Sequence, residues 1–144
     1  MPNPTGCVFA CPEFREAALD AARQSIVLLE NDGVLPLDVA AMTNTTTIAV
    51  IGQACHSTGA HVWGVDRALA NQSAFPYGTT IFQELAMRTP GAVSYSEGCN
   101  VTEGSVCGAE HLNKAVSAAT ASDLVVVCVG ERHYAEKRGD RNGE

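Results

Sequence analysis

The chain has 144 residues, of which 46% are hydrophobic and 17% charged, and its formal net charge is −7. This balance is typical of one globular domain, and the acidic excess argues against a nucleic-acid partner, because phosphate binding needs clustered lysine and arginine. No apolar run approaches the roughly 20 residues of a membrane span, so we expect no membrane insertion. The first residues lack the basic and apolar regions of a secretory signal, so no signal peptide is expected in this chain.

Helical and strand-like segments alternate from the start of the chain. An alanine-rich helix with an apolar stripe is predicted from Glu13 to Leu29, with Gly33 as its left-handed stop. The β-branched run Thr46–Gly52 predicts a buried strand. The polar stretch Gln53–Gly78 that follows is too long for a tight turn, and a threonine-capped helix is then predicted over Thr79–Arg88.

The second half of the chain repeats this alternation. A strand is predicted at Ala92–Ser96, a helix at Ala109–Ser122 and a second apolar strand at Asp123–Gly130. Unbroken β-branched strands between helices favour an α/β fold, a three-layer sandwich with a mostly parallel sheet and helices on both faces. Because few clear strands are present, we expect this sheet to be incomplete at the C-terminus. Residues 1–12 are expected to form an N-terminal linker, and residues 13–144 a single partial domain.

Cysteines are numerous for this length, with six in the chain and no CxxC pair. Cys99 and Cys107 flank a short polar loop that a disulfide could close in an oxidising compartment. Cys128 lies inside a strand and is expected to be a small buried hydrophobic residue. Cys107 and His111 have a spacing that a metal could use, but no second pair accompanies them, so no metal site is expected.

Sequons for N-glycosylation begin at Asn44, Asn71 and Asn100. Composition alone predicts about one such motif in a chain of this size. Taken with the cysteines, the sequons favour an extracellular or secretory-pathway location for a longer parent protein.

Ionisable residues crowd the segment GERHYAEKRGDR, which follows the last predicted strand. In parallel sheets the ligand crevice lies beyond the carboxyl ends of the strands, so this segment stands where a site would be. Glu131 and Glu136 could both transfer protons, but the cations beside Glu136 would lower its pKa. Asp140 and Arg141 could pair with each other or bind hydroxyl groups. Without further information, these residues favour a solvated, salt-bridged loop.

The polar stretch after the first predicted strand offers one aromatic candidate and one test for a cofactor. Trp63 could stack on a sugar ring, or it could cap the sheet. The glycines of VIGQACHSTG follow a strand, as in a dinucleotide site, but the pattern GxGxxG is absent. No cofactor is therefore expected.

Several segments together resemble one family, glycoside hydrolase family 3. The segment that opens its C-terminal domain resembles AARQSIVLLENDGVLPLD, and its following strand and turn resemble TIAVIGQAC. A later helix start and strand are similar to YGTTIFQEL and VSYSEGCNVT. The strand and loop that end in the family's Glu…Asp-Arg motif resemble SDLVVVCVGERHYAEKRGDR. The resemblance covers nearly the whole chain, from about Glu13 to Arg141.

This resemblance implies part of a retaining, exo-acting β-glycosidase that hydrolyses β-linked glucosides or xylosides. Family members place the active site between a (β/α)8 barrel and an α/β sandwich, and the nucleophile is an aspartate on the barrel. This chain contains no barrel, so the chain alone is expected to be inactive. The general acid/base role carries over to Glu136, with Asp140 and Arg141 as supporting substrate-binding residues and Trp63 as a weaker one.

Two functions of other classes stay open beside the enzyme. The chain could be a carbohydrate-binding or interaction module without catalysis, or, as a third interpretation, a nucleotide-binding domain. A barrel encoded in frame before this chain would favour the enzyme, and a thermal shift with NAD or ATP would favour the nucleotide-binding domain.

Overall fold

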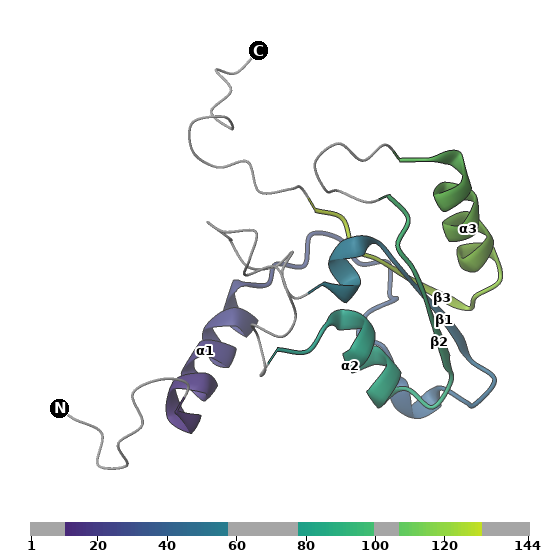
Figure 1. Ribbon diagram of the computed structural model, residues 1–144. Helices are drawn as coiled ribbons and strands as arrows, with labels where there is room; N and C mark the ends of the chain where they lie inside the picture. The colour runs from purple at the N-terminus through teal and green to yellow at the C-terminus, as the bar shows by residue number, and fades with distance from the viewer. Residues whose placement is uncertain (1–10, 58–77, 100–106, 131–144) are drawn as a thin grey trace, which may run out of the picture. The chain divides into compact units, whose positions relative to one another are not determined.

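The computed structural model describes residues 11–57, 78–99 and 107–130. The chain divides into two compact units, Met1–Leu37 and Asp38–Glu144. The described elements, with η for short 3-10 helices, are α1 (Pro12–Ser25), η1 (Val39–Ala41), β1 (Thr47–Ile51), η2 (Gln53–His56), α2 (Ile81–Arg88), β2 (Ala92–Ser96), α3 (Ala109–Thr120) and β3 (Leu124–Val127) (Figure 1). Each predicted helix and strand has a counterpart among them.

The helix α1 is shorter than its predicted counterpart. It ends at Ser25, and Ile26 already has an extended backbone with φ −75° and ψ 127°. The prediction that the helix continues to Leu29 is therefore wrong. Branching at Cβ makes Ile26 and Val27 poor helix residues, which favours an extended chain here. Gly33 does have a left-handed φ of 85°, but in the connector rather than at the end of the helix.

The second unit is built on a parallel sheet with the strand order β2-β1-β3. In its register, Ile48 of the central strand lies opposite Val93 on one side and Leu124 on the other. The helices α2 and α3 lie on opposite faces of the sheet (Figure 1). This arrangement confirms the expected α/β fold with helices on both faces of a parallel sheet.

The core of the second unit lies mainly between the sheet and α2. Ile48 and Val50 of β1 are fully buried, and Phe82 and Leu85 of α2 pack against them. Burying each of these two β1 side chains stabilises the fold by about 1.5 to 3 kcal/mol. Because side chains alternate along a strand, the fully buried Ala49 points toward the other face, where α3 contacts β1.

A polar contact joins the amino ends of β1 and β3. The Asp123 carboxylate accepts hydrogen bonds from the backbone N–H and the hydroxyl of Thr47, both at 2.8 Å. The backbone N–H of Asp123 also donates to the Thr47 carbonyl oxygen at 3.0 Å. The backbone bond from Thr47, and then its hydroxyl bond, lower the pKa of the Asp123 carboxyl below its usual range. The ionised carboxylate therefore helps to hold these two strands in register.

Replacing Asp123 by asparagine is expected to lower stability at neutral pH and to matter less in acid. Because folding lowers the pKa of this carboxyl, its stabilising effect is complete above the unfolded pKa of about 3.9 and is lost as pH falls through the folded pKa. Urea unfolding of both proteins, measured at several values between about pH 7 and about pH 2, should show the two free energies converging in acid. A gap that stays constant over this range would contradict the prediction.

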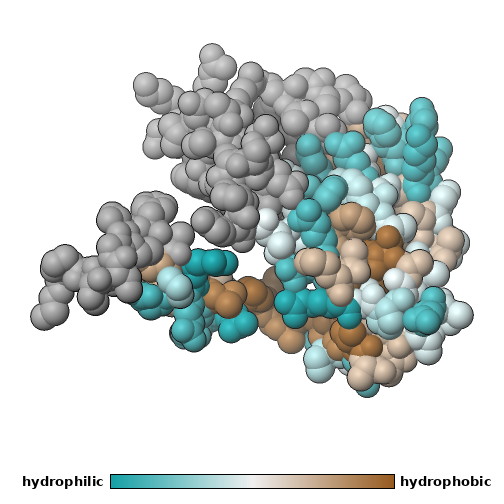
Figure 2. Space-filling model, turned by 60° about the horizontal axis from the view of Figure 1, so that its bottom comes forward, coloured by the Kyte–Doolittle hydropathy of each residue, from teal (hydrophilic) through white to brown (hydrophobic). Residues whose placement is uncertain are grey.

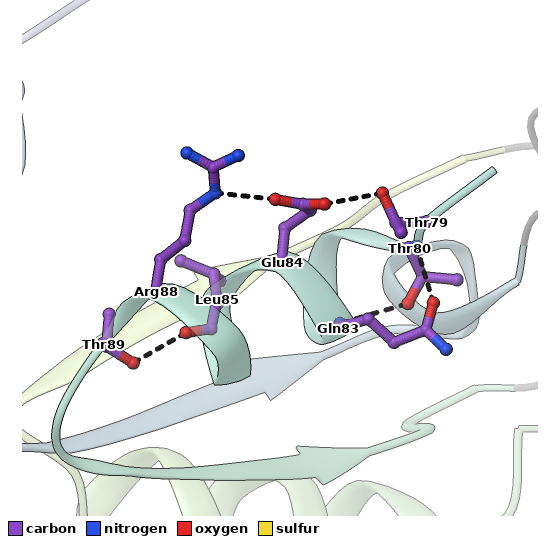
Figure 3. A network of polar contacts seen from close by, with 7 residues as sticks. All are labelled: Thr79, Thr80, Gln83, Glu84, Leu85, Arg88 and Thr89. Carbon is purple, nitrogen blue, oxygen red and sulfur yellow. Dashed lines mark hydrogen bonds and ion pairs between the residues drawn. The ribbon is translucent and has the colours of Figure 1, made fainter. Parts of the chain in front are cut away.

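The helix α2 is closed at both ends by hydrogen bonds of threonine side chains (Figure 3). Thr80, the N-cap, accepts from the Gln83 N–H at 3.2 Å, and the Gln83 side chain accepts from the Thr80 N–H at 2.9 Å. This reciprocal pair is a capping box, which satisfies backbone donors that the first turn of a helix leaves open. At the other end, the Thr89 hydroxyl donates to the Leu85 carbonyl at 2.7 Å. The caps stabilise the two ends of α2, while Phe82 and Leu85 pack the helix against the sheet.

A second network in Figure 3 runs along the outer side of α2. The Glu84 carboxylate accepts from the Thr79 hydroxyl at 2.7 Å and from Arg88 Nε at 2.6 Å. The bond from Thr79, and then the bond from Arg88, lower the pKa of Glu84. This ion pair is exposed, so it contributes little to stability.

Apolar surface remains on the described part of the chain, and brown patches interrupt the teal surface in Figure 2. On β3 and just after it, exposure rises from 37% at Val125 to 59% at Val127 and 90% at Val129. Among the described strands, β3 lies at one edge of the sheet. No helix among residues 11–57, 78–99 and 107–130 is long and apolar enough to cross a membrane.

Candidate functional site

The carboxyl ends of the parallel strands meet at one edge of the sheet, which is where such sheets bind ligands. There β1 continues through Gly52 into η2, and β3 continues through Cys128 to Gly130. The charged segment that the sequence singles out begins directly after Gly130. The described residues at this edge therefore set where that segment starts.

The ends of β1 and β3 contact each other closely at this edge. Gly52 has φ 112°, a conformation that favours glycine, and a Cβ at this position would overlap the carbonyl oxygen of Cys128. The Cys128 N–H donates to the Ile51 carbonyl at 2.8 Å, and the Gly52 N–H donates to the Ser96 carbonyl at 3.0 Å. Gly52 thus lets the two chain segments approach without a side chain between them.

A disulfide between Cys55 and Cys128 reinforces this contact. Their Cα atoms are 5.3 Å apart, and the residues are separated by 73 positions in the sequence. The expectation that Cys128 is merely a buried hydrophobic residue is therefore wrong. A β-strand position and an apolar neighbourhood do not reveal pairing, because the partner cysteine comes from a different strand end. The even number of cysteines was the one sequence signal that could have pointed to it.

A second disulfide lies at the end of β2. Cys99 and Cys107 are bonded, with Cα atoms 4.7 Å apart, so the bridge that the sequence left open is present. Cys107 is consequently not available as a thiolate partner for His111. Within the described ranges, no group of three or more histidine, cysteine or acidic side chains could hold a metal ion.

His56, the last residue of η2, belongs to an aromatic cluster on the α2 face. Its ring centre lies 4.8 Å from that of Phe82 and 5.0 Å from that of Tyr95, both in edge-on arrangements. Its Nδ1 is hydrogen-bonded to the Thr80 hydroxyl at 3.2 Å. The neighbouring thiol of Cys55 is oxidised, so no nucleophile and base pair is formed here. The cluster instead joins η2 to the capped end of α2.

A groove of about 300 Å³ lies between the end of β2 and α3. Glu97, His111 and Lys114 contribute its charged and titratable side chains. Lys114 forms an exposed ion pair with Glu110 at 2.8 Å, which lowers the pKa of Glu110. Burial, and then the charge of Glu97, raise the pKa of Tyr95, whose ring belongs to the aromatic cluster on the α2 face. The described side chains of this groove can donate and accept hydrogen bonds.

The site residues expected from the sequence fall outside the described part of the chain. This applies to Glu136, Asp140 and Arg141, to Glu131, and to Trp63. What the structure does describe is the pair of strand ends from which their segments depart.

Comparison with known proteins identifies the family. Residues 26–143 match the model of the glycosyl hydrolase family 3 C-terminal domain. The chain belongs to this family. The matched region includes the Glu136 and Asp140-Arg141 positions, as well as the whole parallel sheet.

Characterised relatives of this family 3 chain are glycosidases. It is 35% identical to a β-xylosidase of Formosa agariphila over 84% of this chain, and 35% identical to β-D-xylosidase 3 of Arabidopsis thaliana over 87%. It is 30% identical to the lysosomal β-glucosidase of Dictyostelium discoideum over 96% of this chain. The matches cover only 16%, 14% and 18% of these relatives, so the chain spans less than a fifth of their length.

Proposed function

We propose that this chain is part of a retaining, exo-acting β-glycosidase and that it supplies the acid/base loop of the active site. The observation that carries the proposal is the family match over residues 26–143, which includes the charged segment after β3. Glu136 is the general acid/base. Asp140 and Arg141 support the loop and bind substrate hydroxyl groups, and Trp63 adds a weaker sugar contact. The substrate is a β-linked glucoside or xyloside, as the names of the relatives suggest.

In this mechanism two carboxyl groups act on the glycosidic bond in turn. An aspartate from the barrel attacks the anomeric carbon while Glu136 protonates the departing oxygen, which leaves a glycosyl-enzyme intermediate. Glu136 then takes a proton from water as the water attacks the same carbon and releases the aspartate. Two displacements retain the configuration at the anomeric carbon.

The proton transfer requires Glu136 to be protonated in the resting enzyme. The cations Lys137 and Arg138 stand next to it in the sequence and, if close in space, would lower its pKa. Burial of the closed cleft and the negative charge of the second carboxylate would raise the pKa again. The assembled active site, rather than this loop alone, would therefore tune the acid.

The nucleophile must come from a (β/α)8 barrel in a longer protein. Relatives that are several times longer than the matched segment leave room for such a domain. We therefore expect the 144 residues alone to be unable to hydrolyse nitrophenyl β-glucosides or β-xylosides.

The disulfides and one exposed sequon of this chain are typical of proteins in an oxidising compartment. Disulfides join Cys55 to Cys128 and Cys99 to Cys107. Asn44, the first residue of a sequon, is exposed on the turn before β1. Both features support a secretory-pathway or extracellular location for the longer protein.

Replacing Glu136 by glutamine in the longer protein tests the proposed role. Activity on substrates with poor leaving groups should fall by at least about a hundredfold, because loss of general acid catalysis typically costs this much. For activated substrates such as dinitrophenyl glycosides, whose bond cleavage needs no proton, kcat/KM should fall far less. Their kcat should still fall, because Glu136 also activates the attacking water, and added azide should restore it by replacing water as the attacking group.

Glu131→Gln is the matched control, because it removes the other glutamate of the same segment. It should leave the dependence on the leaving group unchanged. Equal kinetics for wild-type and Glu136→Gln proteins would remove the assigned role, and a selective effect of Glu131→Gln would transfer it to the other carboxylate.

A further inference from the structure

Two described contacts hold the exit of β3 against the end of β1. The Cys55–Cys128 disulfide is the covalent one. The second is the hydrogen bond from the Cys128 N–H to the Ile51 carbonyl at 2.8 Å. Gly52 permits this approach, because a Cβ at its position would overlap the Cys128 carbonyl oxygen. Both contacts act at the point where the chain leaves the sheet.

We propose that the Cys55–Cys128 disulfide is a positioning element for catalysis: it anchors the start of the acid/base loop to the end of the central strand. This inference rests on the proposed function of Glu136. The disulfide touches neither substrate nor reacting atoms in this assignment, and it acts only through the loop that follows it.

The anchor is rigid on the side of Cys55. This residue is fully buried and belongs to the same core cluster as Ile48 and Val50. Its N–H also donates to the Gly52 carbonyl at 3.0 Å. The disulfide therefore fixes the position of Cys128 relative to the buried core.

On the other side of the junction, the described side chains add few contacts. Val129 is 90% exposed, so its side chain does not fasten the exit to the core. A Cβ on Gly130 would meet only the Ala54 methyl group, at 3.9 Å, which is ordinary van der Waals contact. Among the described residues, the ties that would remain without the disulfide are the ladder with β1, which reaches the Ile51–Val127 pair, and the Cys128 hydrogen bond to Ile51.

Positioning predicts a selective loss of activity, which a purely structural role does not. A displaced acid/base impairs proton donation to the departing oxygen, and a misplacement of about 1 Å can cost about a hundredfold. Substrates with poor leaving groups depend on that proton, whereas activated aryl glycosides do not. A merely smaller folded fraction would lower both rates by the same factor.

The experiment compares Cys55→Ala/Cys128→Ala with wild type in the longer protein, using unsubstituted phenyl and dinitrophenyl glycosides well below the unfolding temperature. We expect kcat/KM for the poorer leaving group to fall at least about tenfold more than kcat/KM for the better one. The control is Cys99→Ala/Cys107→Ala, which removes a disulfide from the same edge without touching Cys128. The control should keep the wild-type ratio of the two rates.

Glu136→Gln, alone and combined with Cys55→Ala/Cys128→Ala, separates the two assignments. If both single changes are leaving-group selective and the combined protein is no more selective than Glu136→Gln, the positioning role is supported. If only Glu136→Gln is selective, the positioning role is wrong and the proposed function stands. If Glu136→Gln is not selective, the proposed function fails and the positioning role fails with it.

Should the alanine pair not fold, Cys55→Ala/Cys128→Val provides a second variant. Valine restores part of the lost volume and suits the end of a strand, while the covalent tie is still absent. The same leaving-group ratio is then measured, with the same outcomes.

Discussion

Replacement of Gly52 by alanine is expected to lower the free energy of unfolding by about 3 to 5 kcal/mol, in the range of severe single substitutions. Gly52 combines φ 112° with a position at which a Cβ overlaps the backbone carbonyl of Cys128. An L-residue is strained at this φ, and relief of the overlap requires β1 and the exit of β3 to move apart. The same movement strains the Cys128 hydrogen bond to Ile51. Urea unfolding followed by circular dichroism measures the effect.

Gly98→Ala is the matched control for this substitution. Gly98 also has a positive φ, 64°, and lies at the same edge of the sheet, but an added Cβ would meet only the Ile51 side chain at 3.6 Å. Its cost should be about 1 to 2 kcal/mol, the usual penalty for a left-handed conformation without a clash. If Gly52→Ala and Gly98→Ala lose similar free energies of unfolding, the overlap with the Cys128 carbonyl adds no cost beyond the strained φ, and the prediction is wrong.

Removal of the Cys55–Cys128 disulfide is expected to destabilise the second unit by about 4 kcal/mol. The bond closes a loop between residues separated by 73 positions. Opening it returns a large amount of conformational entropy to the unfolded chain, which favours unfolding. Thermal or urea unfolding of Cys55→Ala/Cys128→Ala, without reductant, measures the difference from wild type.

The Cys99–Cys107 disulfide allows a direct comparison of loop lengths. Its residues are separated by only 8 positions, so Cys99→Ala/Cys107→Ala should lose about 2.5 kcal/mol. In the chain-entropy account the longer loop gives the larger stabilisation, so removal of Cys55–Cys128 should cost more than removal of Cys99–Cys107. A larger loss for the short loop would mean that local packing, rather than loop closure, dominates at this edge.

Local patterns predicted the regular elements of the second unit closely. The strand Ala92–Ser96 has the predicted bounds, and Thr80 caps α2 as the threonine cap before this helix implied. Such features depend on neighbours within a few residues, which a sequence displays directly. The end of α1 was predicted wrongly because the apolar stripe continues past Ser25, while the backbone preference of Ile26 and Val27 opposes a helix.

The location of the candidate site in the fold could also be predicted from the sequence. The alternation of helices and strands predicts a parallel sheet, and a parallel sheet places the segments after its strands at one edge. Glu136, Asp140, Arg141 and Trp63 remain predictions, because they lie outside the described residues. Cys55 was missed as a structural residue, since nothing near it in the sequence distinguishes it from the other cysteines.

The sequence by itself determined the family, the order of helices and strands, and the edge at which a site would lie. These follow from motifs and from periodicity, which are properties of neighbouring residues. Only the tertiary structure decided that β1 lies between β2 and β3, that Cys55 is bonded to Cys128, and that Gly52 must lack a side chain. These features depend on which distant segments lie side by side, and strand order and register bring those segments together only in the folded chain.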